Sequence, residues 1–198
     1  MTNRIFNFGA GPAVLPTIVL EQMREYLLAL PGIGMSVLEI SHRSSAFDEV
    51  LATAEANIRS LGSIPDDYHV LFMQGGATHQ FAMVPMNLFL KSRTADYIVT
   101  GSWAQKAAKE AAKFGTVRVA ATTEGEGFCR VPTAQEIDFA ETSSYVHLTS
   151  NNTIFGTEWE LLPDTGDVPS VIDASSNIFS RPIDVARHGL IYAGAQKN

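Results

Sequence analysis

The sequence predicts an α/β fold, in which a mainly parallel sheet is covered by helices on both faces. Three observations lead to this prediction. Short apolar runs bounded by turn residues recur from residue 69 onward, helix-like stretches alternate with the first of them, and 45% of the 198 residues are hydrophobic. Short buried strands that alternate with helices are typical of parallel sheets with both faces covered.

The first sixty residues are predicted to be mainly helical. After an extended piece at residues 4–8 and a turn at 9–12, a helix should begin at Pro16 and end at Pro31-Gly32, with apolar residues spaced by three and four. A second helix is expected from Ser45, where Ser45 and Asp48 resemble a capping box, to Gly62. Its buried stripe should consist of Phe47, Val50, Leu51, Ala54, Ile58 and Leu61.

From residue 69 the pattern changes to strand, turn and helix. One helix should follow the Gly75-Gly76 turn and contain Pro85, and another should run from about Trp103 to Phe114. The predicted strands cover residues 69–73, 97–100, 117–121, 145–149, 171–174 and 190–193.

Composition excludes several classes of protein. With 14 basic and 21 acidic residues the net charge is −7, which is unsuited to binding nucleic acid over a broad surface. The single cysteine, Cys129, allows no intrachain disulfide and no cysteine-based zinc site, so we expect no metal centre. Because the N-terminus has no apolar core of signal-peptide length and no apolar run approaches a membrane span, we expect a cytoplasmic protein without a membrane partner.

The candidate functional residues follow the predicted strands. Ligands of such folds bind beyond the carboxyl ends of the strands. The segments at those ends are Gly75-Gly76-Ala77-Thr78, Gly101-Ser102-Trp103, Ser150–Thr153, Asp173 and Gly194–Lys197. Each has an ordinary structural interpretation as well: a tight turn, a packed indole, a helix cap or a solvated lysine. Their common position at one edge is the more informative signal.

One cofactor uses all of these groups. Pyridoxal phosphate requires a lysine that binds it covalently, an acid against its pyridine nitrogen and donors for its phosphate. A protonated ring nitrogen lets the ring accept the electron pair of a substrate carbanion, and an acid is needed to hold that proton. Asp173 directly follows the apolar residues Val171-Ile172, and Lys197 stands 24 residues later, after the next predicted strand. These two residues therefore supply the acid and the lysine that the cofactor requires.

Six segments, spread over the whole chain, resemble the phosphoserine aminotransferases, which are fold-type I pyridoxal-phosphate enzymes of the class V aminotransferase group. AGAQKN together with SHRS and SRPIDV is specific to this family. The matching segments are FNFGAGPAVLP (6–16), SVLEISHRS (36–44), LFMQGGATHQF (71–81), ADYIVTGSWA (95–104), DASSNIFSRPIDV (173–185) and YAGAQKN (192–198).

The resemblance implies a role for each matching residue. Lys197 would bind the cofactor covalently and move the substrate proton, and Asp173 would pair with the pyridine nitrogen. Trp103 would stack on the ring and Thr153 would bond its phenolic oxygen. The phosphate would be held by Ala77, Thr78 and Gln196, and the acidic group of the substrate by Arg43 with His42 beside it.

The resemblance also implies an architecture and a reaction. We expect a three-layer aminotransferase large domain at residues 16–198, preceded by an N-terminal segment at 1–15 and truncated before a small C-terminal domain. The expected enzyme is a cytoplasmic homodimer that converts 3-phosphohydroxypyruvate and glutamate to phosphoserine and 2-oxoglutarate. The family implies a place in serine biosynthesis and, in many bacteria, in pyridoxine biosynthesis. Family members are nearly twice as long, so little activity is expected of a chain ending at Asn198. Thr78 also stands where some members carry an arginine.

Three alternatives remain open on the sequence. Another class V enzyme, such as an alanine– or serine–glyoxylate aminotransferase or a cysteine desulfurase, would not be expected to carry SHRS and AGAQKN together. A truncated chain could fold or pair without catalysing a reaction. A dinucleotide-binding protein is disfavoured because no G-x-G-x-x-G follows a predicted strand.

Overall fold

The computed structural model describes residues 4–89 and 94–197 of the chain. The chain divides into two compact units, Met1–Val70 and Leu71–Asn198, which we describe separately. The predicted division into a segment at 1–15 and a domain at 16–198 stays a prediction.

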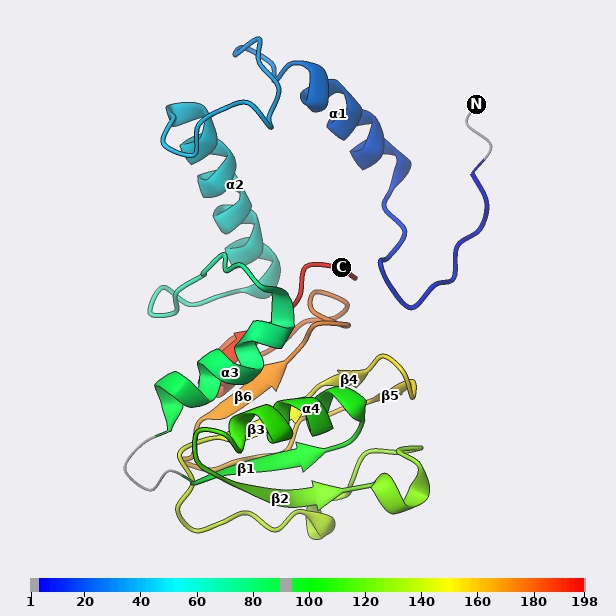
Figure 1. The fold of residues 1–198 in the computed structure, drawn as a ribbon, viewed down its shortest axis with the longest axis vertical. Coiled ribbons are helices and arrows are strands. Elements are labelled where there is room, and N and C mark those ends of the chain that lie inside the picture. Colours follow the sequence, from blue (N-terminus) through cyan, green and yellow to red (C-terminus); the bar gives the residue numbers. More distant parts are fainter. Residues whose placement is uncertain (1–3, 90–93, 198) are drawn as a thin grey trace. The chain divides into compact units, whose positions relative to one another are not determined.

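The Leu71–Asn198 unit is built around a five-stranded parallel sheet (Figure 1). Its strands lie in the order β2-β1-β3-β6-β7, and each neighbouring pair is parallel. A two-stranded antiparallel hairpin, which the sequence did not predict, follows β3. The bounds are β1 (Thr94–Val99), β2 (Thr116–Thr122), β3 (Val146–Thr149), β6 (Ser170–Asp173) and β7 (Leu190–Tyr192), with β4 (Asn151–Asn152) and β5 (Thr157–Glu158) in the hairpin.

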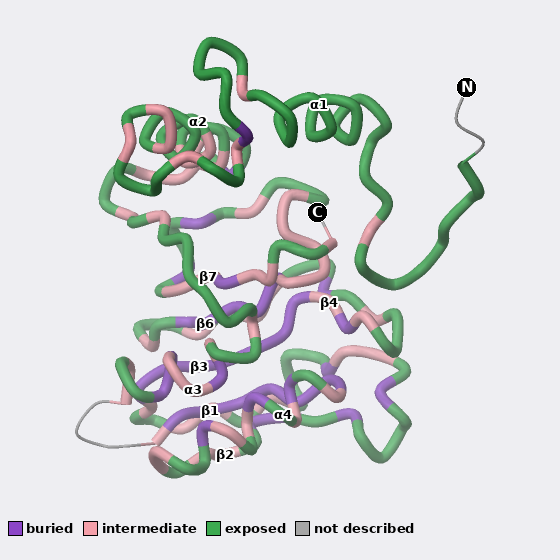
Figure 2. Tube along the Cα trace, turned by 45° about the horizontal axis from the view of Figure 1, so that its top comes forward, coloured by how far each residue is buried: buried purple, intermediate pink, exposed green. Residues whose placement is uncertain are grey.

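The two faces of this sheet carry separate apolar clusters, because successive side chains of a strand point to opposite faces. Tyr97 and Val99 of β1 pack on one face with Val171 of β6, whereas Ile98 packs on the other with Leu148 and Ile172. These six side chains are at most 5% exposed, and Figure 2 shows β1, β3 and β6 as buried along most of their length. The core of the protein is therefore the central sheet.

Two helices cover the first face (Figure 1). Helix α3 (Gly76–Leu88) contributes Phe81 and Val84, and helix α4 (Ser102–Ala111) contributes three buried alanines. Small alanine side chains let α4 lie close to the strands beneath it. Within the described residues, the second face packs against side chains from irregular segments, namely Val131, Ile137, Phe139, Leu162, Val168 and Ile178. The short 3-10 turns of the unit are η1 (Glu124–Glu126), η2 (Ala134–Glu136) and η3 (Val185–Arg187).

The Met1–Val70 unit contains the two predicted helices. Helix α1 (Thr17–Leu28) begins directly after Pro16, and helix α2 (Ser45–Gly62) has the predicted bounds. The predicted capping residue of α2 is wrong by one position: Ser44 Oγ accepts a hydrogen bond from Phe47 N at 3.3 Å. At the C-terminal end, Ser63 and not Gly62 adopts the left-handed conformation (φ 47°) that commonly ends a helix.

Two further expectations are wrong within the described residues. Residues 69–73 form no strand, and Leu71 is 73% exposed, because no neighbouring strand pairs with this segment. The expected buried stripe of α2 is not buried: Val50, Leu51 and Leu61 are exposed, and the other three residues of the stripe are only partly buried. Apolar periodicity marks the face that can be buried, but a second surface must be present to bury it.

The predicted α/β class with a parallel central sheet is confirmed. Of the two expected helical layers, the described residues of this unit show one, formed by α3 and α4. The central sheet is parallel, its strands alternate with α3 and α4 in the first part of the unit, and five of the six predicted strands are present within a few residues of their expected bounds.

Candidate active site

The carboxyl ends of four strands meet at one edge of the sheet. The register pairs Thr149 at the end of β3 with Asp173 at the end of β6, and Asp173 in turn with Tyr192 at the end of β7. Helix α4 begins just after the end of β1, so Trp103 enters at the same edge. The topology thus brings together the strand ends that the sequence singled out.

Asp173 is the most deeply buried of the candidate residues, with 4% exposure. Its Oδ1 accepts hydrogen bonds from Ser175 N at 3.0 Å and from Ser175 Oγ at 2.6 Å. Burial raises the pKa of this carboxyl, and the bonds from Ser175 and the Tyr192 hydroxyl oppose that rise. Among the residues that the structure describes, no cation forms an ion pair with Asp173, so this acid is suited to a cationic ligand group.

The segment that carries Lys197 is tied to Asp173 through Ser175. Gly194 N donates to Ser175 Oγ at 3.1 Å, while the same hydroxyl donates to Asp173. The segment also passes close to the start of α3, because a Cβ placed on Gly194 would lie 3.7 Å from Ala77 Cβ. Lys197 is half-buried and Gln196 is exposed. The lysine segment, the acid and the first turn of α3 therefore form one connected arrangement.

The start of α3 is suited to binding an anion. Gly75 and Gly76 have φ of +90° and +60°, and no side chain caps the helix. A Cβ on Gly75 would lie 1.6 Å from His79 Nδ1, so no other residue fits there without moving that imidazole. Ala77 and Thr78 lie in the first turn, where backbone N–H groups have no partner within the helix and the helix dipole favours negative charge.

Trp103 presents a partly exposed ring at this edge. The residue is 36% exposed, and Lys106 Nζ lies 4.2 Å from the ring centroid. Close packing holds the neighbouring backbone: a Cβ on Gly101 would lie 2.5 Å from Asn152 Oδ1, and Asn152 Nδ2 donates to Thr100 Oγ1 at 3.2 Å. An exposed indole on a fixed backbone can stack on a planar ring.

Thr153 lies in the turn between β4 and β5 and is half-buried. Hydrogen bonds fix the loops around it: Ser176 Oγ donates to Asn151 O at 2.9 Å, and Ser150 Oγ donates to Asn177 Oδ1 at 2.6 Å. These contacts join the loop after β3 to the turn after β6.

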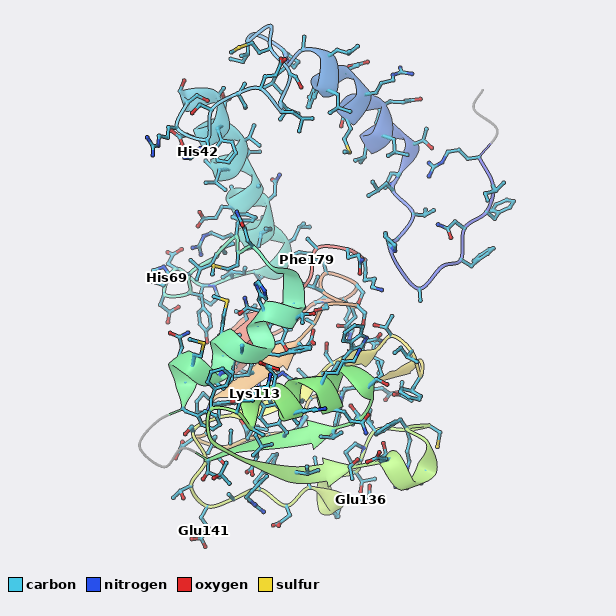
Figure 3. The ribbon with its side chains drawn as sticks, viewed as in Figure 1. His42, His69, Lys113, Glu136, Glu141 and Phe179 are labelled. Carbon is cyan, nitrogen blue, oxygen red and sulfur yellow. The ribbon has the colours of Figure 1, made fainter. Side chains whose placement is uncertain are left out.

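His42 and Arg43 belong to the Met1–Val70 unit, directly before α2, and both are exposed (Figure 3). Their part in a site with the other candidates stays a prediction.

The sequence interpretation missed four residues at or beneath the site. Ser175 organises Asp173, and its position two residues after the acid is a recognisable turn signal. His147 and Tyr192 form a buried hydrogen bond of 2.8 Å on the helix-covered face. The buried Thr149 hydroxyl has no partner among the described atoms. Alternation along β3 and β7 would have placed these last three side chains on the face that carries Asp173.

Two cavities lie away from the candidate residues. The larger cavity has a volume of about 660 Å³, and its lining residues come from the segments 129–137 and 157–164. Trp159 is one of them, and its buried Nε1 has no hydrogen-bond partner among the described atoms. A smaller one, of about 170 Å³, includes Ser150 and Asn177 in its lining. Within the described residues, no group of three or more His, Cys, Asp or Glu residues could hold a metal ion, and no helix is long and apolar enough to cross a membrane.

Comparison with known proteins gives a consistent result. The profile of the family "Aminotransferase class-V" matches residues 5–198. A phosphoserine aminotransferase of Herpetosiphon aurantiacus is 53% identical over 194 residues, which cover 98% of this chain and 54% of that protein.

Solved structures are similar as well. The phosphoserine aminotransferase of Bacillus circulans subsp. alkalophilus superposes with a TM-score of 0.95 at 47% identity, over 100% of this chain and 55% of that one. The pyridoxal-phosphate-bound phosphoserine aminotransferase of Trichomonas vaginalis gives 0.90 at 35% identity, over 98% and 55%. The chain thus spans about half the length of the relatives it matches.

The class of the protein follows from the family match over residues 5–198, which agrees with the parallel sheet described above. This chain belongs to the class-V aminotransferases. Within that class, the similar proteins reported above are phosphoserine aminotransferases.

Proposed function

We propose that the full-length protein is a phosphoserine aminotransferase dependent on pyridoxal phosphate. It would convert 3-phosphohydroxypyruvate and glutamate to phosphoserine and 2-oxoglutarate in serine biosynthesis, and act in pyridoxine biosynthesis as well. We further propose that it works as a cytoplasmic homodimer. The names of its relatives support the reaction, and the observation that carries the cofactor is the buried Asp173, which has no cation among the described residues.

The residues present fit pyridoxal phosphate. Its phosphate is an anion, and the uncapped first turn of α3 offers backbone N–H groups from Ala77 and Thr78. Its pyridine nitrogen is cationic when protonated, and Asp173 is a buried carboxylate that lacks such a partner. The backbone bond from Gly194 to Ser175 Oγ keeps the Lys197 segment beside the acid. Each feature of the cofactor therefore has a complementary group in this unit.

Bound pyridoxal phosphate would supply an electron-accepting ring for the substrate α-carbon. Lys197 would hold the cofactor covalently until the amino group of the substrate takes its place. The released lysine would then act as a general base that takes the α-proton of the substrate, and as a general acid that returns this proton. Asp173 would hold a proton at the pyridine nitrogen. Ala77, Thr78 and Gln196 would bind the phosphate.

Three further side chains would position the reacting groups. Trp103 would cover one face of the ring, and Thr153 would donate to its phenolic oxygen. Arg43, with His42 beside it, would bind the acidic group of the substrate, since a guanidinium pairs with a carboxylate or phosphate through two parallel hydrogen bonds. Arg43→Gln should therefore raise the KM for phosphoserine and leave the visible spectrum of the cofactor unchanged.

Borohydride reduction followed by peptide mapping tests the proposal. The full-length protein should absorb violet light, and reduction should fix the cofactor to Lys197. Cofactor found on Lys91, which lies outside the described residues, or on Lys106, Lys109 or Lys113 would contradict the site. A glutamate-dependent assay with 3-phosphohydroxypyruvate then tests the reaction. Turnover with glyoxylate alone would favour another class-V aminotransferase.

A further inference from the structure

Asn152 is a buried amide that joins two segments of the candidate site. It is the last residue of β4, directly before Thr153, and it is 2% exposed. Its Nδ2 donates to Thr157 Oγ1 at 2.9 Å, across the hairpin, and to Thr100 Oγ1 at 3.2 Å, just after the end of β1. An amide nitrogen carries two hydrogens, so it can bond both threonines at once. One side chain thus connects the Thr153 turn with the segment that leads into α4.

The surroundings fix the orientation of this amide. Its Nδ2 also lies 3.4 Å from Thr157 O, and a carbonyl oxygen can only accept a hydrogen bond. The Asn152 Oδ1 lies on the side of Gly101, where an added Cβ would be only 2.5 Å from it. Gly101 has an extended φ of 170°, which any residue can adopt, so its lack of a side chain serves the close approach of the amide. The hairpin therefore packs directly against the start of α4.

The turn that carries Thr153 has contacts of its own. Gly156 N donates to Asn152 O at 2.8 Å, which closes the turn. Phe155 in the same turn packs its ring against Phe128, with centroids 5.0 Å apart. Backbone and ring contacts thus hold the turn in one shape, and the Asn152 side chain sets its position relative to α4.

The neighbouring residue, Asn151, anchors the hairpin to a different segment. Successive side chains of a strand point to opposite sides, so Asn151 can reach a partner that Asn152 cannot. Its backbone oxygen and its Oδ1 accept hydrogen bonds from Ser176 Oγ at 2.9 and 2.8 Å. Ser176 stands three residues after Asp173. Thr153 is therefore carried by a hairpin that is bonded both to the start of α4 and to the segment after Asp173.

We propose that Asn152 is a positioning residue that fixes the Thr153 turn to the start of α4, so that Thr153 and Trp103 keep a constant position relative to each other. Thr153 directly follows Asn152, and Trp103 stands only two residues after Gly101, so a contact between Asn152 and Gly101 controls both. Only the use of this arrangement, to present a hydroxyl and an indole to the same cofactor ring, rests on the proposed function.

Hydrogen exchange in the full-length protein without cofactor tests the connection. Thr100→Val removes one acceptor of the amide and keeps the shape of the side chain, whereas Asn152→Ala removes the amide itself. Each should accelerate exchange of the Gly156 amide about tenfold, the effect of one lost hydrogen bond. Thr100→Ser keeps the hydroxyl and should exchange like the wild type. An unchanged Gly156 amide in Thr100→Val would overturn the proposal, even if Asn152→Ala failed to fold.

The environment of Trp103 provides a second readout without cofactor. In protein labelled with 5-fluorotryptophan, the ¹⁹F signal of Trp103 is assigned through Trp103→Phe. This signal should shift or broaden in Asn152→Ala, although the substitution lies on the hairpin and not on α4. A signal identical to that of the wild type would contradict the proposed coupling.

Ser170→Ala is the matched control, because it removes a different buried hydrogen bond of the same sheet. Ser170 is 3% exposed, and its Oγ lies 2.8 Å from His188 Nδ1. It stands at the start of β6, at the edge of the sheet opposite to Asp173. The control should leave both Gly156 exchange and the Trp103 signal unchanged. Effects as large as those of Asn152→Ala would show general loosening and would overturn the proposal.

Cofactor binding tests whether Asn152 acts through Thr153. Asn152→Ala and Thr153→Val should each weaken the binding of pyridoxal phosphate about tenfold, and the double variant should be little weaker than either. A displaced turn no longer offers the hydroxyl, so removing it a second time costs nothing. Losses that simply multiply would contradict the proposal. If the wild type did not bind pyridoxal phosphate, the proposed function would fail, and the measurements without cofactor would still decide the connection.

Discussion

The two units of the chain use apolar residues in opposite ways. In the Leu71–Asn198 unit, the five residues Ala95–Val99 of β1 are each at most 5% exposed. In the Met1–Val70 unit, helix α1 has no buried residue, and Ile18, Met23 and Leu27 are 46–61% exposed. Both segments are rich in apolar residues, so hydrophobicity does not separate them. The difference is that β1 has strands on both sides and helices above it.

The contrast extends to the chemistry. The candidate cofactor-binding residues all lie in the well-packed unit, either beyond strand ends of the central sheet or in the first turn of α3. Arg43 and His42, the candidate substrate residues, lie exposed in the other unit. Groups that must be held to within fractions of an ångström are thus carried by the rigid sheet. Four predictions test this comparison.

The largest effect should follow from Lys197→Ala in the full-length protein. Losing both the covalent attachment and the proton-transfer group should reduce turnover by ~10⁴-fold, equivalent to ~5 kcal/mol in the barrier. Steady-state kinetics and the visible spectrum measure the two losses. Lys113→Ala is the control, because this exposed lysine pairs with Glu110 at 2.6 Å and carries no proposed role (Figure 3). Retention of substantial turnover by Lys197→Ala would remove the lysine from the mechanism.

Matched isoleucine substitutions in the two units should differ strongly in stability. Ile98→Ala, at a site with 0% exposure, should lower the free energy of unfolding by ~2–5 kcal/mol. Ile18→Ala, at a site with 61% exposure, should change it by less than ~0.5 kcal/mol. Urea denaturation of the full-length protein measures both values. A loss at Ile18 as large as that at Ile98 would break the comparison, because it would show that α1 is covered in the full-length protein.

Asp173→Asn should affect catalysis more than folding. An amide cannot hold the pyridine nitrogen protonated, while the side-chain volume barely changes. The lost charged hydrogen bond corresponds to ~1.5–3 kcal/mol, or roughly one to two powers of ten in kcat if it is expressed in the transition state. Kinetics and thermal melting of the same preparation separate the two effects. Full turnover in this variant would make Asp173 a structural cap.

The stability of the protein should depend on pH through the buried His147. Unfolded His147 takes up a proton near its ordinary pKa of 6.5, whereas the folded protein takes it up only near 3. The unfolded state therefore binds more protons between these values, and stability should fall as the pH is lowered through this range, by about 1.4 kcal/mol for each pH unit.

His147→Gln should flatten that pH dependence. His69→Gln in the other unit should not change it, because this side chain is exposed (Figure 3). Urea denaturation at a series of pH values measures the slope, and an identical slope in wild type and His147→Gln would contradict the assignment.

Much of the site could be read from the order of residue types. Asp173 and Lys197 were placed at the same edge because one apolar run directly precedes Asp173 and another ends four residues before Lys197, and Gly75-Gly76 marked the start of α3. The strand expected at residues 69–73 failed, since an extended segment becomes a strand only through hydrogen bonds to a neighbour. The role of Ser175 was missed because it depends on the approach of Gly194 from another strand.

The sequence by itself determined which faces of the elements are apolar, where turns interrupt them, and which reactive side chains stand at strand ends. These properties arise from residues close together in the chain. Only the tertiary structure decided that Asp173 is buried without a cation among the described residues, that Tyr192 and His147 meet beneath it, and that α1 stays exposed. Burial and hydrogen bonding between distant segments require two surfaces to meet, and the pattern of one segment does not specify its partner.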